Sequence, residues 1–561
     1  MEKNLYYYLA KFLFIFLGIL VIIPIIVGFM GFFLLSFGYF PILGKNELNL
    51  NYFHISLDIA GISKSIILSL FTGLCSTILA LFFSQVILLY CFKTSVFNYV
   101  KTIISPLIAL PHITMAIGLI FLFSPSGLFF RLVSPWLTGF DRPPNFFMIP
   151  DDYGIFLILG LILKEIPFFI LVSLSAIQQI SARKIFDLGK SLQNSNFSSW
   201  CILIFPLIYK KIRLVIFIVI SFTASVVDMS LILAPSTPST LAIKILQIYQ
   251  SSDTDSFFIA SNLALIQLFI IVILLLFWMI LERIVRHKLF FIFIIKILSL
   301  KIFFAKNLVF VLGVMLFFLS VLGILSSLLW GFSENWYFPS FFPNDLNIDT
   351  FINFYKENKF VIFISIFICF VVSLLSSLLT IIWVELTDIL KIKKIYFEWI
   401  IFIPLFIPQI SFLIGLQSFI IFLNFESFLI PLIIVQLFYV IPYSFIILAP
   451  SLREINKDII RVAASLGKNR FRRLIHIKIP IIMSSLLTSF AIGMLVSFSL
   501  YTPVYFIGAG RINTLTVEAL NLALSGSRQD LGVATFFQII IPILILISVA
   551  YFNKKMSKWR F

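Results

Sequence analysis

Gly189, Lys190 and Ser191 form a short motif whose residue types could hold a phosphate group. A phosphate-binding loop of this kind needs a glycine, four further residues and then Gly-Lys-Ser or Gly-Lys-Thr, directly after a β-strand. Lys184 stands where the first glycine is required, and apolar segments typical of membrane helices flank the motif. The spacing therefore excludes a nucleotide site here, and we find no other segment that offers one.

The other reactive side chains do not form a catalytic or metal-binding pattern. No spacing among the cysteines suits a disulfide framework or a metal site, and the histidines never pair at a ligand spacing. They are Cys75, Cys91, Cys201, Cys369, His54, His112, His287 and His476. We therefore expect no metal, no cofactor bound by this chain and no enzymatic activity in it.

The composition identifies a polytopic membrane protein. Of the 561 residues, 61% are hydrophobic and 12% are charged, whereas a soluble domain carries about 25% charged residues. The net charge of +17 could suggest nucleic acid, but basic residues also collect in the cytoplasmic loops of membrane proteins. We expect contact with membrane lipid and none with nucleic acid.

Windows of about 20 apolar residues predict the membrane-spanning helices. Twelve spans are expected near residues 10–36, 65–92, 98–123, 154–178, 206–232, 258–281, 307–331, 360–387, 396–423, 427–450, 480–507 and 533–552. With both termini in the cytoplasm, the inside segments hold 31 of the 41 lysines and arginines. This bias predicts that both termini are cytoplasmic, with the first helix retained rather than cleaved.

The chain contains an internal repeat, which four pairs of segments show in the same order. "LPHITMAIGL" (110–119) matches "IPQISFLIGL" (407–416) at an offset of 297 residues. Three later pairs have offsets of 275, 274 and 274: 166–177 with 441–452, 204–208 with 478–482, and 240–246 with 514–520. The change in offset places about 22 extra residues in the outside loop 124–152. We predict an all-α protein of two parallel six-helix repeats.

The second half carries a patterned cytoplasmic loop, "RVAASLGKNRFRRLIHIKIPII" (461–482). Its helix-forming run ends at Gly467, where glycine can adopt a positive φ and terminate a helix. Pro480 then begins the next span, where its missing N–H costs nothing. The residues that carry the pattern are Arg461, Ala463, Ala464, Ser465, Leu466, Gly467 and Pro480.

The first half has the same loop at the 274-residue offset, anchored on Pro206. Its corresponding residues are Asp187, Gly189, Ser191, Leu192, Gln193 and Pro206. Gln193 takes the place of the turn glycine. Because glutamine resists a positive φ and asparagine tolerates it, we predict that this helix runs one residue longer than its partner and turns at Asn194.

Both loops resemble the "EAA" loop of ABC-importer permeases, which has Glu-Ala-Ala, three residues, Gly, nine residues and Ile-x-Leu-Pro. The leading acid is missing at Arg461, whereas "AASLG" (463–467) is typical of the family. The resemblance covers roughly 60–282 and 355–553 and implies the type I permease fold. It also implies a short coupling helix that docks on a separate ATPase homodimer, which binds the ATP, and a periplasmic or extracellular solute-binding protein.

Within that family, fused two-repeat permeases occur in the iron(III) and thiamine importer group. The loop "SPSG…SPWLTG…RPP" and the segment "SVVDMSLILAPSTPSTLA" look most like a thiamine-type branch of this group. The resemblance thus implies a multi-pass protein of the bacterial inner membrane. The solute itself stays open between iron(III), thiamine and another small molecule.

The expected organisation has five parts. Residues 1–59 form an N-terminal membrane helix and outside loop, 60–282 the first repeat, and 283–354 a linker with its own membrane helix and outside loop. Residues 355–553 form the second repeat and 554–561 a basic cytoplasmic tail. The segment 282–306 alternates basic and apolar residues, which suits either an amphipathic helix on the inner leaflet or an extension of the flanking spans.

Few polar residues lie inside the expected spans. Asp228 is expensive to place in a membrane, so it either lines a solute path or caps a helix end at the outer interface. Its counterparts in the second half are Tyr501 and Thr502. Lys164 and Glu165 fit contacts between helices better than a substrate site.

An alternative to the importer permease is a secondary transporter driven by an ion gradient, which can also have twelve helices in two repeats. That class predicts several acids within the membrane and transport that survives depletion of ATP. It does not predict two cytoplasmic loops with the same residue spacing.

Overall fold

The computed structural model describes residues 2–285, 288–392, 395–424, 427–526 and 528–558. Almost all of the regular structure is helical, with a two-stranded antiparallel sheet of β1 (Ser333–Asn335) and β2 (Asp345–Leu346) in the loop between α14 and α15. The protein is therefore an all-α polytopic membrane protein.

Each half contains the same succession of helices. The first half comprises α3 (Ile62–Cys91), α4 (Val96–Ala109), α5 (His112–Phe123), α7 (Ile155–Gln178), α8 (Ala182–Ser191), α9 (Asn196–Ser199), η2 (Trp200–Ile204), α10 (Phe205–Thr223), α11 (Asp228–Leu233), α12 (Leu241–Tyr249) and α13 (Thr254–Val285). The second comprises α15 (Asp349–Leu390), α16 (Ile395–Phe402), η3 (Ile403–Leu405), α17 (Gln409–Phe422), α18 (Leu429–Arg453), α19 (Lys457–Ser465), α20 (Arg470–Arg473), η4 (Leu474–Lys478), α21 (Ile479–Ser499), α22 (Thr502–Gly508), α23 (Leu515–Ser525) and α24 (Arg528–Lys558).

The remaining elements precede or interrupt these two series. They are α1 (Glu2–Ser36), η1 (Pro41–Leu43), α2 (Asn51–Asp58), α6 (Leu128–Val133) and α14 (Lys288–Phe332). The short helix α6 lies in the loop between α5 and α7, which is longer than its counterpart in the second half. The backbone of the linker is helical from Lys288 onward, but the side chains of residues 286–308 lie outside those the structure describes, so its amphipathic character stays a prediction.

The number of spans differs from the expected twelve. Within the described residues, ten helices are long and apolar enough to cross a membrane, and eleven if α16–η3 and α17 count as one span bent by 102°. The remaining expected span, 206–232, falls mainly on α10, whose 19 residues include Lys210, Lys211 and Arg213. Helix α10 is long enough to span a membrane. It is not among the ten apolar helices because its first half contains these three basic residues.

Several expected spans are broken because the chain contains prolines or short polar segments. The span 98–123 breaks between α4 and α5, where Leu110 is extended (ψ 141°) before Pro111, as residues before proline usually are. The spans 206–232 and 480–507 each end early and continue as the short helices α11 and α22. Each half therefore has helix ends buried among the apolar helices, where polar side chains are needed to satisfy the backbone.

The two helices outside the repeated series, α1 and α14, each pack on both halves. Helix α1 lies against α17 and α15 of the second half and α13 of the first, and α14 lies against α5 and α3 of the first half and α24 of the second. Glycines allow the crossings of α1 with α17 and of α14 with α5: a Cβ on Gly415 would lie 1.9 Å from the carbonyl oxygen of Gly28, and one on Gly118 would lie 3.0 Å from the carbonyl carbon of Gly323. Gly118 and Gly415 are equivalent at the 297-residue offset, so the two close contacts follow the internal repeat.

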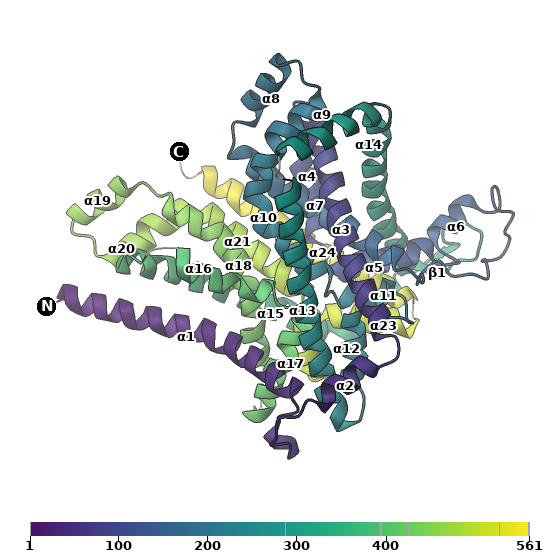
Figure 1. Cartoon of the computed structure of the whole chain (residues 1–561), viewed down its shortest axis with the longest axis horizontal. Coiled ribbons are helices and arrows are strands. Elements are labelled where there is room, and N and C mark those ends of the chain that lie inside the picture. Colours follow the sequence, from purple (N-terminus) through teal and green to yellow (C-terminus); the bar gives the residue numbers. More distant parts are fainter. Residues whose placement is uncertain (1, 286–287, 393–394, 425–426, 527, 559–561) are drawn as a thin grey trace.

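Figure 1 shows that the two halves diverge toward α8 and α19. Helices α3, α7 and α10 run toward α8, and helices α15, α18 and α21 run toward α19. The start of α1 lies on the same side as α19, whereas α2 and α12 lie at the opposite end. This arrangement places the two patterned loops at one end of the molecule.

Candidate functional site

The first loop consists of α8, a turn, α9 and η2. Helix α8 ends at Ser191, and the next turn is closed by N–H groups of Gln193 and Asn194, which donate to the carbonyl oxygens of Lys190 (2.9 Å) and Gly189 (3.2 Å). These two bonds form a Schellman motif. Gln193 itself has φ +60°, so the prediction that the helix runs longer and turns at Asn194 is wrong. The two bonds satisfy carbonyls at the helix end, and they require the positive φ at residue 193.

The second loop has the same backbone geometry 274 residues later. Helix α19 ends at Ser465, and the N–H groups of Gly467 and Lys468 donate to the carbonyl oxygens of Ala464 (3.1 Å) and Ala463 (3.2 Å). Gly467 has φ +73°, which confirms the predicted glycine turn. The following short helices also begin alike, with Ser195 Oγ accepting from Ser198 N–H and Asn469 Oδ1 from Arg472 N–H.

Both loops turn equivalent apolar side chains toward solvent. Leu188 and Leu192 are 62% and 71% exposed, and their counterparts Val462 and Leu466 are 59% and 73% exposed. The opposite faces hold Gly189 and Ala463, which are buried. A Cβ on Gly189 would lie 2.6 Å from Ser199 Oγ, so the absence of a side chain lets α8 lie directly on α9.

The other predicted loop residues occupy supporting positions. Ser191 Oγ and Ser465 Oγ donate to carbonyl oxygens one turn back in their own helices, at 2.8 and 2.7 Å. Pro206 and Pro480 lie in the first turn of α10 and α21, as expected from their missing N–H groups. Ala464 is exposed beside Leu466.

The two loops are attached to the membrane helices by different contacts, and in the second loop Lys478 of η4 pairs with Glu385 of α15. Asp187 pairs with Lys93 in the turn between α3 and α4, and the Phe186 ring packs 5.2 Å from Phe92, which lies 5.3 Å from Trp200. At the position of Asp187 the second loop has Arg461, which pairs within its own helix with Asp458 at 3.1 Å. The first loop is therefore fastened to the turn after α3 by an ion pair and an aromatic cluster.

Sequence reasoning missed both fastening contacts. Lys93 lies on the turn after the second expected span, and Trp200 is the first residue of η2. The opposite charges of Lys93 and Asp187 were visible, but their distance of 94 residues along the chain hid the pairing.

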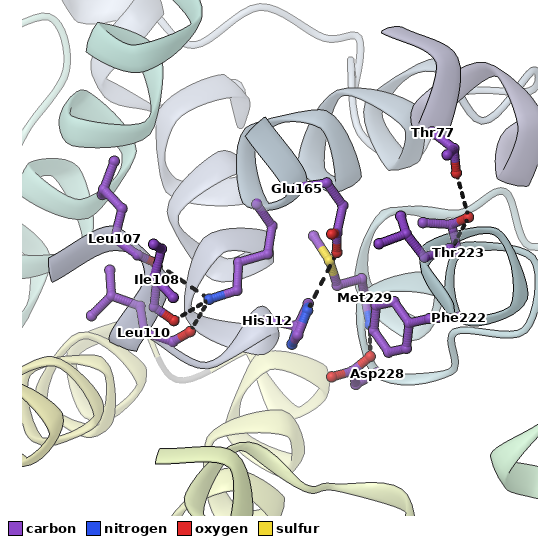
Figure 2. A network of polar contacts seen from close by, with 12 residues as sticks. Thr77, Leu107, Ile108, Leu110, His112, Glu165, Phe222, Thr223, Asp228 and Met229 are labelled. Atoms are coloured by element: carbon purple, nitrogen blue, oxygen red, sulfur yellow. Dashed lines mark hydrogen bonds and ion pairs between the residues drawn. The ribbon is translucent and has the colours of Figure 1, made fainter. Parts of the chain in front are cut away.

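A cluster of polar side chains lies within the membrane region of the first half, as Figure 2 shows. Lys164 is buried on α7, and its Nζ donates to the carbonyl oxygens of Leu107 (3.3 Å), Ile108 (2.9 Å) and Leu110. These carbonyls end α4 at the break before Pro111, where no helix N–H reaches them. Lys164 thus caps a broken helix, in agreement with the expected contact between helices.

His112 lies between two carboxylates in the same cluster. Its Nε2 is 3.8 Å from Glu165 Oε1, and Figure 2 places its ring between Glu165 and Asp228. Asp228 is buried and accepts the N–H of Met229 at 2.9 Å, at the start of α11. It therefore caps a helix end, yet in a buried break within the bundle rather than at a solvated outer interface.

The second half has a corresponding but uncharged contact. Thr502 begins α22 as Asp228 begins α11, and its Oγ1 donates to Oε1 of Gln409 at 3.0 Å. Gln409 is the counterpart of His112 at the 297-residue offset. Tyr501 is buried beside this contact, with its ring 5.6 Å from that of Tyr505. The three predicted path residues thus lie at equivalent helix breaks, and a role in a solute path stays a prediction.

The described residues contain no group of three or more His, Cys, Asp or Glu side chains that could hold a metal ion. The four cysteines are free. The arrangement offers contact surfaces at the two loops and polar groups at the helix breaks.

Fold and loops together define an all-helical, multi-pass membrane protein of two parallel repeats that presents matching helical loops at one end. The chain is similar to the inner membrane ABC transporter permease protein YnjC of Escherichia coli (strain K12), at 24% identity over 456 residues, which cover 81% of this chain and 80% of that protein. This similarity supports a place among the ABC transporter permeases. No protein-family model matches the chain, and no solved structure matches it.

Proposed function

We propose that this chain is the transmembrane permease subunit of an ATP-driven importer, with both permease halves in one chain, coupled to a separate ATPase through α8 and α19. The observation that carries the proposal is the equivalence of the two loops. Both end in the same Schellman motif at a 274-residue offset, and both expose apolar side chains at the same positions. A short helix with an exposed apolar face suits a groove on a partner protein.

Two matching loops in one chain fit two matching grooves, as an ATPase homodimer would supply. ATP is bound by that partner, and this chain needs no cofactor of its own. The similarity to a protein named as an inner membrane ABC transporter permease supports this assignment. With both loops facing the ATPase, the start of α1 lies on the cytoplasmic side in Figure 1, in keeping with the basic residues of the predicted inside segments.

The opposite end of the molecule would then meet a solute-binding protein in the periplasm or outside the cell. Asp228, Tyr501 and Thr502 are the proposed residues of the solute path, since they lie at the paired helix breaks. We assign the chain to the iron(III) and thiamine importer group on its outside loop 124–152 and the segment around Asp228.

The experiment is co-purification of the full-length chain with an ABC ATPase subunit from the same cells. The double variant Leu192→Asp, Leu466→Asp should lose the ATPase, because a charge replaces each exposed leucine at the groove. Both side chains are more than 70% exposed, so the variant should fold normally.

Leu48→Asp is the matched control, since Leu48 is 67% exposed and lies in the outside segment before α2. That variant should retain the ATPase. Full retention by the double variant would refute the coupling role of the loops. If the wild-type chain binds no ATPase and still transports after ATP depletion, the secondary transporter becomes the better account.

A further inference from the structure

The segment α20–η4 carries a basic surface that the proposed coupling role does not explain. Arg470, Phe471, Arg472 and Arg473 form this surface, which we call the arginine patch. At the 274-residue offset the first loop has Asn196, Phe197, Ser198 and Ser199 in these positions, none of them charged. Because the first loop has the same backbone without these charges, the fold does not require the arginines.

Within the part of the chain that the structure describes, no acidic side chain forms an ion pair with the patch. Among the ion pairs between described residues, the second half has Arg453 with Glu398, Arg461 with Asp458, and Lys478 with Glu385. None of the three patch arginines takes part in such a pair, and Nε of Arg473 is buried without a hydrogen-bond partner. The patch therefore presents positive charge that no described carboxylate pairs with.

The patch lies where a membrane helix leaves the bilayer. Helix α20 continues through η4 into α21, which gives a helical span of 30 residues from Arg470 to Ser499. At about 1.5 Å per residue such a helix is roughly 45 Å long, whereas the hydrocarbon core is about 30 Å thick. About ten residues at the Arg470 end thus extend through the layer of lipid headgroups.

Phe471 supports contact with lipid rather than with water. Its side chain is 67% exposed between the arginines, and Ile475, one turn further on, is 40% exposed. Apolar side chains beside basic ones suit the boundary between acyl chains and headgroups. Each basic residue in a cluster next to a membrane helix strengthens the binding of anionic lipid by about 1 kcal/mol, or roughly fivefold in affinity.

We propose that the arginine patch binds the phosphate groups of anionic phospholipids in the cytoplasmic leaflet, and that this lipid contact anchors the second loop. The first loop is fastened by Lys93, Asp187 and its aromatic cluster instead. The first loop would thus be held by the protein alone, and the second by the membrane together with the ion pair between Lys478 and Glu385. The proposal does not depend on which solute or ATPase the chain serves.

The test uses the full-length chain in nanodiscs made of equal parts phosphatidylglycerol and phosphatidylcholine, with F471W as a local reporter. The two lipids are brominated one at a time, because bromine quenches tryptophan fluorescence. The quenching measured on the chain without F471W is subtracted, which leaves the signal of the tryptophan at position 471. Brominated phosphatidylglycerol should quench more strongly, and the excess should shrink as salt rises from about 0.05 M to about 0.5 M because surface charges become screened.

The charge-neutral variant R470Q/R472Q/R473Q in the F471W chain should lose the preference for phosphatidylglycerol. The matched control R183Q/K184Q/K190Q removes the same charge from the first loop and should keep the preference. The salt series uses the F471W chain with its arginines intact. It therefore tests the proposal even if the charge-neutral variant fails to fold.

Two results would overturn the proposal. One is a phosphatidylglycerol preference that persists in the charge-neutral variant or at high salt. The other is equal quenching by both lipids together with shielding of position 471 by an added acidic peptide, which would assign the patch to an acidic protein surface.

Discussion

Replacing Gly467 by alanine should loosen the end of α19 without disturbing the packing around it. Gly467 has φ +73°, and a Cβ at this position would meet no atom within 4 Å. The cost is therefore the backbone strain of a left-handed residue with a side chain, about 1–2 kcal/mol. At about 1.36 kcal/mol per factor of ten, local opening should become roughly 5- to 30-fold more frequent.

Hydrogen–deuterium exchange with mass spectrometry measures this opening directly. Exchange in peptides covering 463–468 should accelerate, since the N–H groups of Gly467 and Lys468 close the turn. The converse variant Gln193→Gly should slow exchange at 189–194 by about fivefold, because it relieves the positive φ that glutamine adopts there.

Gly510→Ala is the control for Gly467→Ala. Gly510 also has a positive φ, +74°, with no atom within 4 Å of an added Cβ, but it lies after α22. Its exchange effect should be confined to its own turn. Unchanged exchange at 463–468 in Gly467→Ala would refute the Schellman geometry of the second loop.

Three further variants test other parts of the structure. Asp187→Asn should raise exchange in α8 a few-fold and leave α19 unchanged, because it removes a partly exposed ion pair with Lys93 worth about 0.2–1 kcal/mol. Gly415→Leu should sharply lower the unfolding temperature, since even a Cβ would meet a carbonyl oxygen at 1.9 Å, whereas Gly18→Leu, with no atom within 4 Å, should not. Lys164→Met should destabilise the protein by about 2–3 kcal/mol in thermal unfolding, since it removes charged hydrogen bonds to three buried carbonyls. ATPase co-purification should persist in Lys164→Met, and an unchanged melting temperature would contradict the capping role.

Much of the architecture was predictable because apolar composition and internal repetition are strong signals. The loop offset of 274 residues, found from short matches, recurs in the ends of α8 and α19 and in η2 and η4. The extra residues of the first half contain α6, as the change in offset indicated. Element order therefore follows from the sequence once the repeat is recognised.

The breaks within spans were harder to predict. Windows of hydropathy average over a proline such as Pro111, so 98–123 was expected to be one helix. The chain instead separates α4 from α5 and uses Lys164, from another span, to satisfy the freed carbonyls. Hydropathy contains no information about such a partner.

At Gln193 the backbone preference of the residue type gave the wrong position for the turn. A glutamine disfavours a positive φ, yet the hydrogen bonds that end α8 force this conformation at residue 193. The close crossings of α1 with α17 and of α14 with α5 were also missed, because Gly31, Gly118, Gly323 and Gly415 show their role only once their helices cross.

The most direct test of the central claim is the mass of the assembled complex. If α8 and α19 each dock on one ATPase subunit, native mass spectrometry of the purified complex should give one copy of this chain with two ATPase copies, and the double variant Leu192→Asp, Leu466→Asp should give the chain alone. A wild-type chain that binds no ATPase, or a double variant that still carries two copies, would contradict the account.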